Sequence, residues 1–79
     1  MKLKRGMVYR LKRKETSNEY TITEVNDKYV TIKWRSKING IMRVGRPNKE
    51  RLEKEILIGF YTIIFTPKSN IKLYERIIN

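Results

Sequence analysis

The stretch YTITEVNDKYVTIKWRSKINGIMRV, residues 20–44, holds the densest alternation of apolar and polar side chains in this sequence. Successive side chains of a strand point to opposite faces, so this pattern predicts strands with one apolar and one polar face. The expected apolar face is made by Val30, Ile32 and Trp34. The opposite face would carry Lys33 and Arg35, so we expect a meander with a core side and a basic side.

Two turn signals divide this stretch into three antiparallel strands. Asn26 and Asp27 tolerate positive φ and can hydrogen-bond their own backbone, which suits a tight reversal. Asn39 and Gly40 are the commonest pair for a two-residue type I′ hairpin. The register set by that hairpin places Met42 on the basic face together with Val44, against the apolar pattern. We therefore expect a bulge or a change of face over residues 37–42.

The rest of the chain adds three strands and one helix. Gly6 precedes an alternating run, Met7 to Lys12, that predicts a first strand with a basic outer side. Asn48 is a suitable N-cap for a helix over residues 49–58, and Gly59 suits its C-terminal end. Leu52, Ile56 and Leu57 would form the buried face of that helix.

The apolar run FYTIIFT, residues 60–66, predicts a central strand covered on both sides, the most buried of the sheet. Residues 67–70 predict a turn, and residues 71–78 predict a last strand. The expected fold is α+β and mainly β: a small, partly open antiparallel barrel in the order β-β-β-β-α-β-β. With 79 residues and no linker, repeat or low-complexity tract, residues 1–79 are expected to form a single domain.

The composition argues against several classes of function. There is no cysteine and no histidine, which removes disulfides, thiol and imidazole catalysis and the usual zinc ligand sets. No phosphate-binding glycine loop occurs, and Glu50 and Glu53 are typical of a solvated helix face, so no catalytic residue, metal or cofactor is expected. No apolar run is long enough for a membrane span or a signal peptide, and we expect a cytoplasmic protein that does not bind membranes.

The net charge of +11, from 19 Lys and Arg against 8 Asp and Glu, favours a polyanionic partner. A solvated basic surface would show the same composition, and lysines on edge strands also prevent unwanted strand pairing. The basic residues cluster in two acid-poor runs and are expected to gather on one side of the fold. The candidate nucleic-acid-binding residues are Lys2, Lys4, Arg5, Arg10, Lys12, Arg13, Tyr29, Lys33, Arg35, Lys37, Arg43 and Arg46.

Aromatic side chains complete this candidate interface, because exposed rings on a sheet can stack on bases. Tyr29 alternates onto the face of Lys33 and Arg35 and is the candidate stacking ring. Trp34 continues the apolar face and is expected in the core. No helix has the basic surface that reading bases in the major groove requires.

The glycine-led segment from Lys4 to Tyr9, followed by the hairpin of residues 20–34, resembles small SH3-like barrels of nucleic-acid-binding, ribosome-associated and phage-encoded proteins. The resemblance covers about the first half of the chain and implies a partly open barrel used for binding. The KRGMVY opening is also similar to the start of MazF-type ribonuclease toxins, which share that barrel. Their later Arg-Pro and Thr-bearing strands have no counterpart here.

Three functions follow as hypotheses. The first is a non-enzymatic DNA- or RNA-binding protein that contacts phosphates with little sequence preference. The alternative is a phage-type inhibitor or adaptor whose basic face docks on an acidic surface of a host protein. A small endoribonuclease that uses Arg, Lys and Tyr is the third. The sequence leaves the oligomeric state open.

Overall fold

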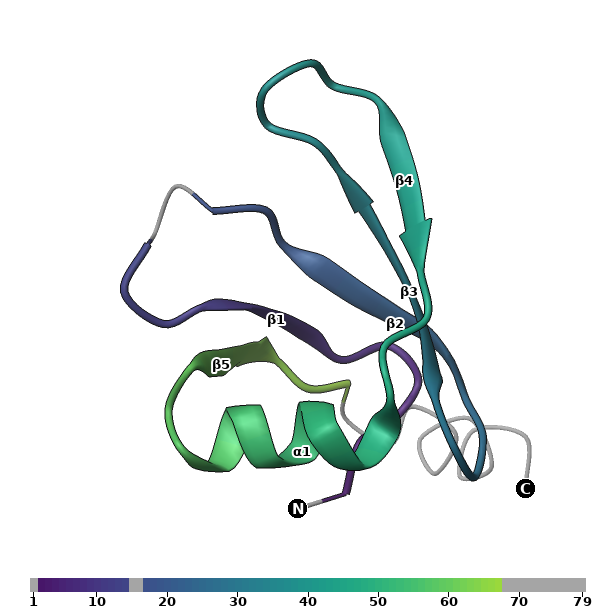
Figure 1. Ribbon diagram of the computed structural model, residues 1–79. Helices are drawn as coiled ribbons and strands as arrows, with labels where there is room; N and C mark the ends of the chain where they lie inside the picture. Colours follow the sequence, from purple (N-terminus) through teal and green to yellow (C-terminus); the bar gives the residue numbers. More distant parts are fainter. Residues whose placement is uncertain (1, 15–16, 68–79) are drawn as a thin grey trace, which may run out of the picture.

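The computed structural model describes residues 2–14 and 17–67, which form five strands and one helix (Figure 1). The elements are β1 (Val8–Leu11), β2 (Tyr20–Val25), β3 (Val30–Arg35), β4 (Met42–Gly45), α1 (Lys49–Leu57) and β5 (Tyr61–Phe65). The strands pair antiparallel in one open sheet of order β4-β3-β2-β1-β5. The expected fold class, mainly β with one short helix, is confirmed. The strand expected at residues 71–78 and most of the preceding turn lie outside the described residues.

The inner face of the sheet carries the core, and α1 lies against it (Figure 1). Tyr9 and Ile22 alternate onto this face from neighbouring strands, and Leu52 and Ile56 pack on it from the helix. The apolar pattern of β3 is confirmed, because Val30 and Ile32 are buried. Within residues 2–14 and 17–67, the buried apolar side chains are Leu3, Met7, Tyr9, Ile22, Val30, Ile32, Leu52 and Ile56. Within the described residues, no helix is long and apolar enough to cross a membrane.

Both predicted ends of α1 are confirmed. The Asn48 side chain accepts a hydrogen bond from the Arg51 N–H at 2.9 Å, as an N-cap does. Gly59 has a φ of +85°, and its N–H donates to the Ile56 carbonyl while the Phe60 N–H donates to Glu55. These two bonds form a Schellman motif that satisfies the last carbonyls of the helix.

The prediction is wrong for one residue of the buried helix face. Leu57 is 67% exposed, whereas Leu52 and Ile56 are buried as expected. A single residue step turns a helix by about 100°, which carries Leu57 away from the stripe facing the sheet. The adjacent Ile58 is also exposed, at 78%. The C-terminal end of α1 therefore presents apolar side chains to solvent.

The turn between β2 and β3 is at the predicted position. The Asn26 side chain accepts hydrogen bonds from the backbone N–H groups of Lys28, at 2.9 Å, and Tyr29, at 2.8 Å. Among the described residues, only glycines have positive φ, so the turn does not use the tolerance of Asn26 and Asp27 for a left-handed backbone. The predicted hydrogen bonding of the Asn26 side chain to the nearby backbone is confirmed and closes the turn.

The hairpin between β3 and β4 departs from the predicted type I′ turn. Arg35 pairs with Met42 and Lys33 pairs with Val44, which leaves a six-residue loop over residues 36–41. This register differs by two residues from that of the predicted turn, and a shift of two preserves which side chains share a face. Met42 and Val44 therefore do lie on the basic face. The predicted bulge or change of face is wrong, because the pairing of β3 with β4 is regular.

The strand predicted to be central, β5, forms an edge of the described sheet. It pairs with β1 alone among the described strands, and its last residues Ile64 and Phe65 are 40% and 56% exposed. The prediction that it is the most buried strand is wrong. Its apolar composition reflects packing of Tyr61 and Ile63 against the core on one side and exposed apolar side chains on the other.

Candidate nucleic-acid interface

The β3–β4 pairing continues past the ends of both strands and forms a long two-stranded ribbon. The register of Lys33 with Val44 extends to an isolated bridge between Tyr29 and Asn48. We call residues 29–35 and 42–48 the ribbon, and the side without the core its outer face. Alternation places four predicted site residues on this outer face. They are Tyr29, Lys33, Arg35 and Arg46, and all four are exposed.

The outer face of the ribbon mixes cations with apolar side chains. Met42 and Val44 are 53% and 58% exposed and lie directly opposite Arg35 and Lys33. Directly opposite side chains on one face of an antiparallel pair are close enough to touch. The apolar groups therefore separate the two cations from the free edge of β4.

Tyr29 is 38% exposed, so its predicted exposure is confirmed. The guanidinium carbon of Arg46 lies 5.8 Å from the centroid of the Tyr29 ring, a cation–π arrangement. This contact places the Arg46 guanidinium over one face of the ring. A base that stacked on the opposite face would meet an aromatic ring with a phosphate donor close by.

The carboxylates of the described residues leave the ribbon cations without ion pairs. The two ion pairs in the described residues both lie on α1, between Arg51 and Glu55 at 3.6 Å and between Lys54 and Glu50 at 3.8 Å. The helix is balanced, with three cations against three acids. On the outer face, Glu24 pairs with Thr31 in the ladder, and Glu19 lies beside Arg35 at a shallow depression.

Other predicted cations of the second acid-poor run lie elsewhere on the hairpin. Arg43 pairs with Trp34 in the ladder, so it lies on the inner face. Lys37 is in the loop between β3 and β4, where its backbone N–H donates to the Asn18 side chain at 2.9 Å. The expectation that the cations share one side therefore holds for Lys33, Arg35 and Arg46 and is wrong for Arg43.

The predicted cations of the first run flank β1. Arg10 lies on the outer face of β1, and its guanidinium donates to the Leu11 carbonyl at 3.0 Å. Exposed cations precede the strand, and two more follow it. The exposed members of this run among the predicted residues are Lys2, Lys4, Arg5, Lys12 and Arg13. The run therefore spreads along β1 and is separate from the ribbon in the sheet, because β2 lies between them.

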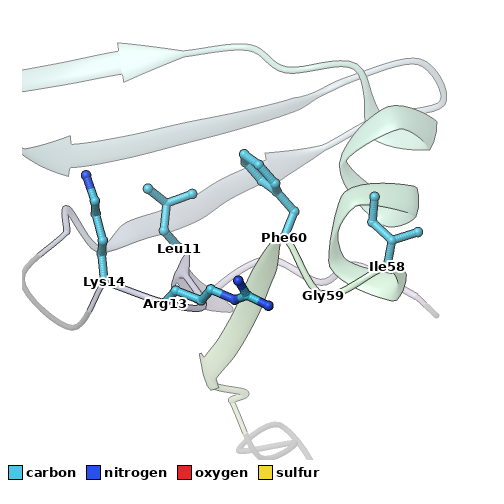
Figure 2. A pocket seen from close by; sticks show the side chains of 6 residues that line it. All are labelled: Leu11, Arg13, Lys14, Ile58, Gly59 and Phe60. Carbon is cyan, nitrogen blue, oxygen red and sulfur yellow. The ribbon is translucent and has the colours of Figure 1, made fainter.

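A groove of about 450 Å³ opens between the end of β1 and the C-terminal end of α1 (Figure 2). It is lined by Leu11, Arg13, Lys14, Ile58, Gly59 and Phe60. Lys12 also lies beside it, because a Cβ built on Gly59 would be 3.6 Å from the Lys12 ammonium nitrogen. The groove combines an apolar floor with three cations. Sequence reasoning missed it, since only the exposed apolar residues at the helix end signal it.

A row of aromatic rings crosses the inner face from the ribbon to this groove. Trp34 packs edge to face on Tyr20 with centroids 5.0 Å apart, and Tyr20 stacks on Tyr9 at 5.2 Å. Tyr9 meets Tyr61, and Tyr61 meets Phe60, each at 5.0 Å. Trp34 is half-buried against the core, which confirms its predicted place on the apolar face. Alternation predicts the face of each ring within its own strand. It does not predict that rings from four strands contact one another.

Burial changes the acidity of two tyrosines in this row. Burial raises the pKa of Tyr9 far above the ordinary range for tyrosine, and nearby Tyr61, Tyr20 and Glu55 raise it further. Burial also raises the pKa of Tyr61, together with Glu55 and Tyr20, and Arg51 opposes this effect. Both hydroxyls therefore keep their protons to a higher pH than a solvated tyrosine does.

The exposed groups of the ribbon supply ammonium and guanidinium donors, one aromatic ring and apolar side chains. In residues 2–14 and 17–67, Asp and Glu side chains form no group of three that could hold a metal ion. This chemistry suits anion contact, since cations of this kind bind phosphate oxygens as donors.

No protein-family model matches the chain, and no match was found among curated proteins or solved structures.

Proposed function

We propose that this protein is a non-enzymatic nucleic-acid-binding protein that contacts phosphates through the outer face of the ribbon with little sequence specificity. One observation carries the proposal: Lys33, Arg35 and Arg46 share an exposed face with Tyr29, and none forms an ion pair with a described carboxylate. Cations that bind phosphates release counterions, which gives affinity that is independent of sequence. The Tyr29 ring adds a stacking surface.

The charge of α1 supports binding without base readout. Its three cations are matched by three acids, and two of the resulting pairs are made within the helix. A helix that reads the major groove presents a basic face to the duplex. Phosphate contact then applies to DNA and RNA alike.

We also propose that the open sheet is a partly open SH3-like barrel, which is supported by the position of β1 between β2 and β5.

The test is a charge-matched comparison of two double variants. Lys33→Gln with Arg35→Gln removes two cations from the ribbon, and Lys49→Gln with Lys54→Gln removes two from the helix. Binding to single- and double-stranded DNA and RNA is measured by fluorescence anisotropy at several salt concentrations. We expect the ribbon variant to lower the slope of log affinity against log salt by about 2, since each phosphate contact contributes roughly 0.9. The helix variant keeps the slope of the unmodified protein.

Two results would contradict this proposal. One is an affinity of the unmodified protein that does not change between low and moderate salt. The other is an equal loss of slope in both double variants, which would assign the effect to net charge instead of to the ribbon.

A second candidate function, a protein-binding inhibitor or adaptor, is favoured by the groove beside α1. Ile58 and Phe60 are 78% and 52% exposed there, next to Arg13 and Lys14. Apolar surface rimmed by cations fits a partner segment that carries apolar and acidic side chains. Capture from lysate treated with nuclease tests this function. A stoichiometric protein that Phe60→Ser releases would support it, whereas loss of every partner after the nuclease step counts against it.

A further inference from the structure

The loop between β3 and β4 presents one fully exposed apolar side chain at the end of the ribbon. Ile38 is 96% exposed, and Ile41 in the same loop is 55% exposed. The loop, residues 36–41, lies at the far end of the hairpin from α1, where it projects away from the body of the protein (Figure 1). We call it the tip loop. Full exposure of an isoleucine forgoes the stabilisation that its burial would give.

The tip loop is held in shape by its own hydrogen bonds. The Gly40 N–H donates to the Ser36 carbonyl at 2.7 Å, and the Ser36 N–H donates to Ile41 at 3.0 Å. The Ile41 N–H donates to the Asn39 side chain at 3.0 Å, and the Ile38 N–H donates to the Ser36 hydroxyl at 3.3 Å. Four of the six backbone N–H groups of the loop thus donate within it, so Ile38 is presented on a preorganised support.

Two further bonds fix the tip loop to its surroundings. The Arg35 guanidinium donates to the Gly40 carbonyl at 3.2 Å, and the Lys37 N–H donates to the Asn18 side chain before β2. Gly40 adopts a φ of +70°, which a glycine does without strain. A contact made by the tip loop therefore requires little ordering on binding, and less affinity is lost to conformational entropy.

Cations flank the tip loop on both faces of the ribbon. Lys33 and Arg35 lie on the outer face, Arg43 lies on the inner face, and Lys37 precedes Ile38. A ribbon with cations on two opposite faces can meet negative charge on two opposite walls. The major groove of double-stranded DNA offers this arrangement, because phosphates line both of its edges and it is wide enough to admit a two-stranded β-ribbon.

We propose that the tip loop inserts Ile38 between adjacent base pairs of double-stranded DNA and thereby bends the duplex. Apolar side chains act in this way when they partly unstack one base step and kink the helix. This inference rests on the proposed nucleic-acid binding and adds a preferred form, the duplex, and a deformation. Lys33, Arg35 and Arg43 hold the phosphates on either side of the step while Ile38 takes the place of one base's stacking neighbour.

The size of the apolar tip favours a base step over a membrane. Unstacking one base step requires insertion of a single side chain. The tip loop provides one apolar side chain that is fully exposed, with Lys37 and Asn39 on either side of it. Membrane anchoring needs a larger buried apolar area, since even a single fatty chain binds only marginally. The polar neighbours of Ile38 would have to enter the lipid with it.

The experiment uses a duplex of about 25 base pairs with fluorescent dyes at its ends and 2-aminopurine at a central TA step, which deforms easily. Energy transfer reports bending, and 2-aminopurine fluorescence reports unstacking. The full chain is compared with Ile38→Asn and with the control Leu57→Asn, which changes an exposed apolar side chain of α1 that lines neither the groove nor the ribbon. Because both side chains are exposed, both variants are expected to fold.

We expect the unmodified protein and Leu57→Asn to raise both signals, and Ile38→Asn to lose both. Its affinity for the duplex should fall by about tenfold, from loss of one buried apolar side chain, with the salt slope kept. Binding to the duplex with unchanged energy transfer overturns the inference and leaves the proposed function standing. Loss of signal in both variants also overturns it, as does Ile38-dependent binding to vesicles of anionic phospholipid without any bending of DNA. Absence of binding to any nucleic acid overturns the proposed function as well.

Discussion

The helix-covered half of the sheet and the ribbon are built from similar alternating sequences, yet they differ in which side chains they bury. In the covered half, Tyr9 and Ile22 are at most 3% exposed, because α1 lies over the inner face. On the outer face of the ribbon, Met42 and Val44 are more than half exposed, although their spacing is that of a strand. Val30 and Ile32, on the inner face of the ribbon, are buried, so packing against the core, and not the strand pattern alone, decides burial.

This difference separates stability from binding within a small chain. The covered half supplies most of the buried apolar side chains of the described residues and carries their two ion pairs. The outer face of the ribbon presents cations and apolar side chains to solvent. Substitutions in the covered half should therefore change the free energy of unfolding, whereas substitutions on the outer face of the ribbon should change binding.

The largest expected effect is on folding, from a cavity in the covered half. Leu52 is 2% exposed, and Leu52→Ala should lower the free energy of unfolding by about 2–5 kcal/mol through lost burial and the cavity left behind. Val44→Ala, in the ribbon, should lower it by less than about 0.5 kcal/mol. Urea denaturation followed by circular dichroism measures both. Similar losses in the two variants would break the comparison.

A smaller effect is expected at the junction of the two regions. Asn48 accepts a hydrogen bond from the Arg51 N–H as the N-cap of α1, so Asn48→Ala should cost about 1 kcal/mol. Asn39 accepts a similar bond from the Ile41 N–H in the tip loop, and Asn39→Ala should cost less because the loop covers no core. Thermal unfolding of the two variants compares the same side chain in the two regions. A greater loss from Asn39→Ala would show that the ribbon contributes to folding.

The smallest effect at neutral pH concerns Tyr9, and it should grow in alkali. Below pH about 10, the ordinary tyrosine pKa, the folded and unfolded chains both keep this proton, so stability is unaffected. Above it the unfolded chain releases the proton while the folded chain retains it, because burial raises the pKa of Tyr9. The free energy of unfolding should therefore fall as pH rises. Tyr9→Phe keeps the ring and should flatten this decline between pH 9 and pH 11, which urea midpoints would show.

Tyr61→Phe sharpens the same measurement, because Tyr61 is less buried than Tyr9 and Arg51 opposes the rise in its pKa. Its effect on the alkaline decline should be the smaller of the two. An equal or larger effect would contradict burial as the main cause.

Local features of the fold could be predicted from the sequence because they depend on residues close along the chain. The cap at Asn48, the glycine end at Gly59 and the alternation of β3 all follow from short-range hydrogen bonding and side-chain direction. The turn at Asn26 could be predicted for the same reason, because its side chain bonds the backbone two and three residues further on. These features involve few competing arrangements.

The errors concern contacts between distant segments or competition within a loop. The tip loop adopts six residues because Ser36 and Asn39 side chains bond its backbone, which outweighs the type I′ preference of Asn39 and Gly40. The edge position of β5 depends on which strands pair with β1, and the apolar composition of β5 does not indicate how the strands pair.

The candidate site was predictable to the extent that it lies on one strand. Tyr29, Lys33 and Arg35 share a face through alternation alone, whereas Arg46 joins them only through the register of β4. The groove requires Leu11 to meet Phe60, which are separated by most of the domain. No spacing rule in the sequence brings such residues together.

The position of Trp34 gives this protein an internal reporter. It is the sole tryptophan, it lies on β3 within the ribbon, and it forms one end of the aromatic row through its contact with Tyr20. Excitation of the tyrosines should pass along rings about 5 Å apart to the indole. Its emission should therefore register any movement of the hairpin relative to the body, without a label attached to either.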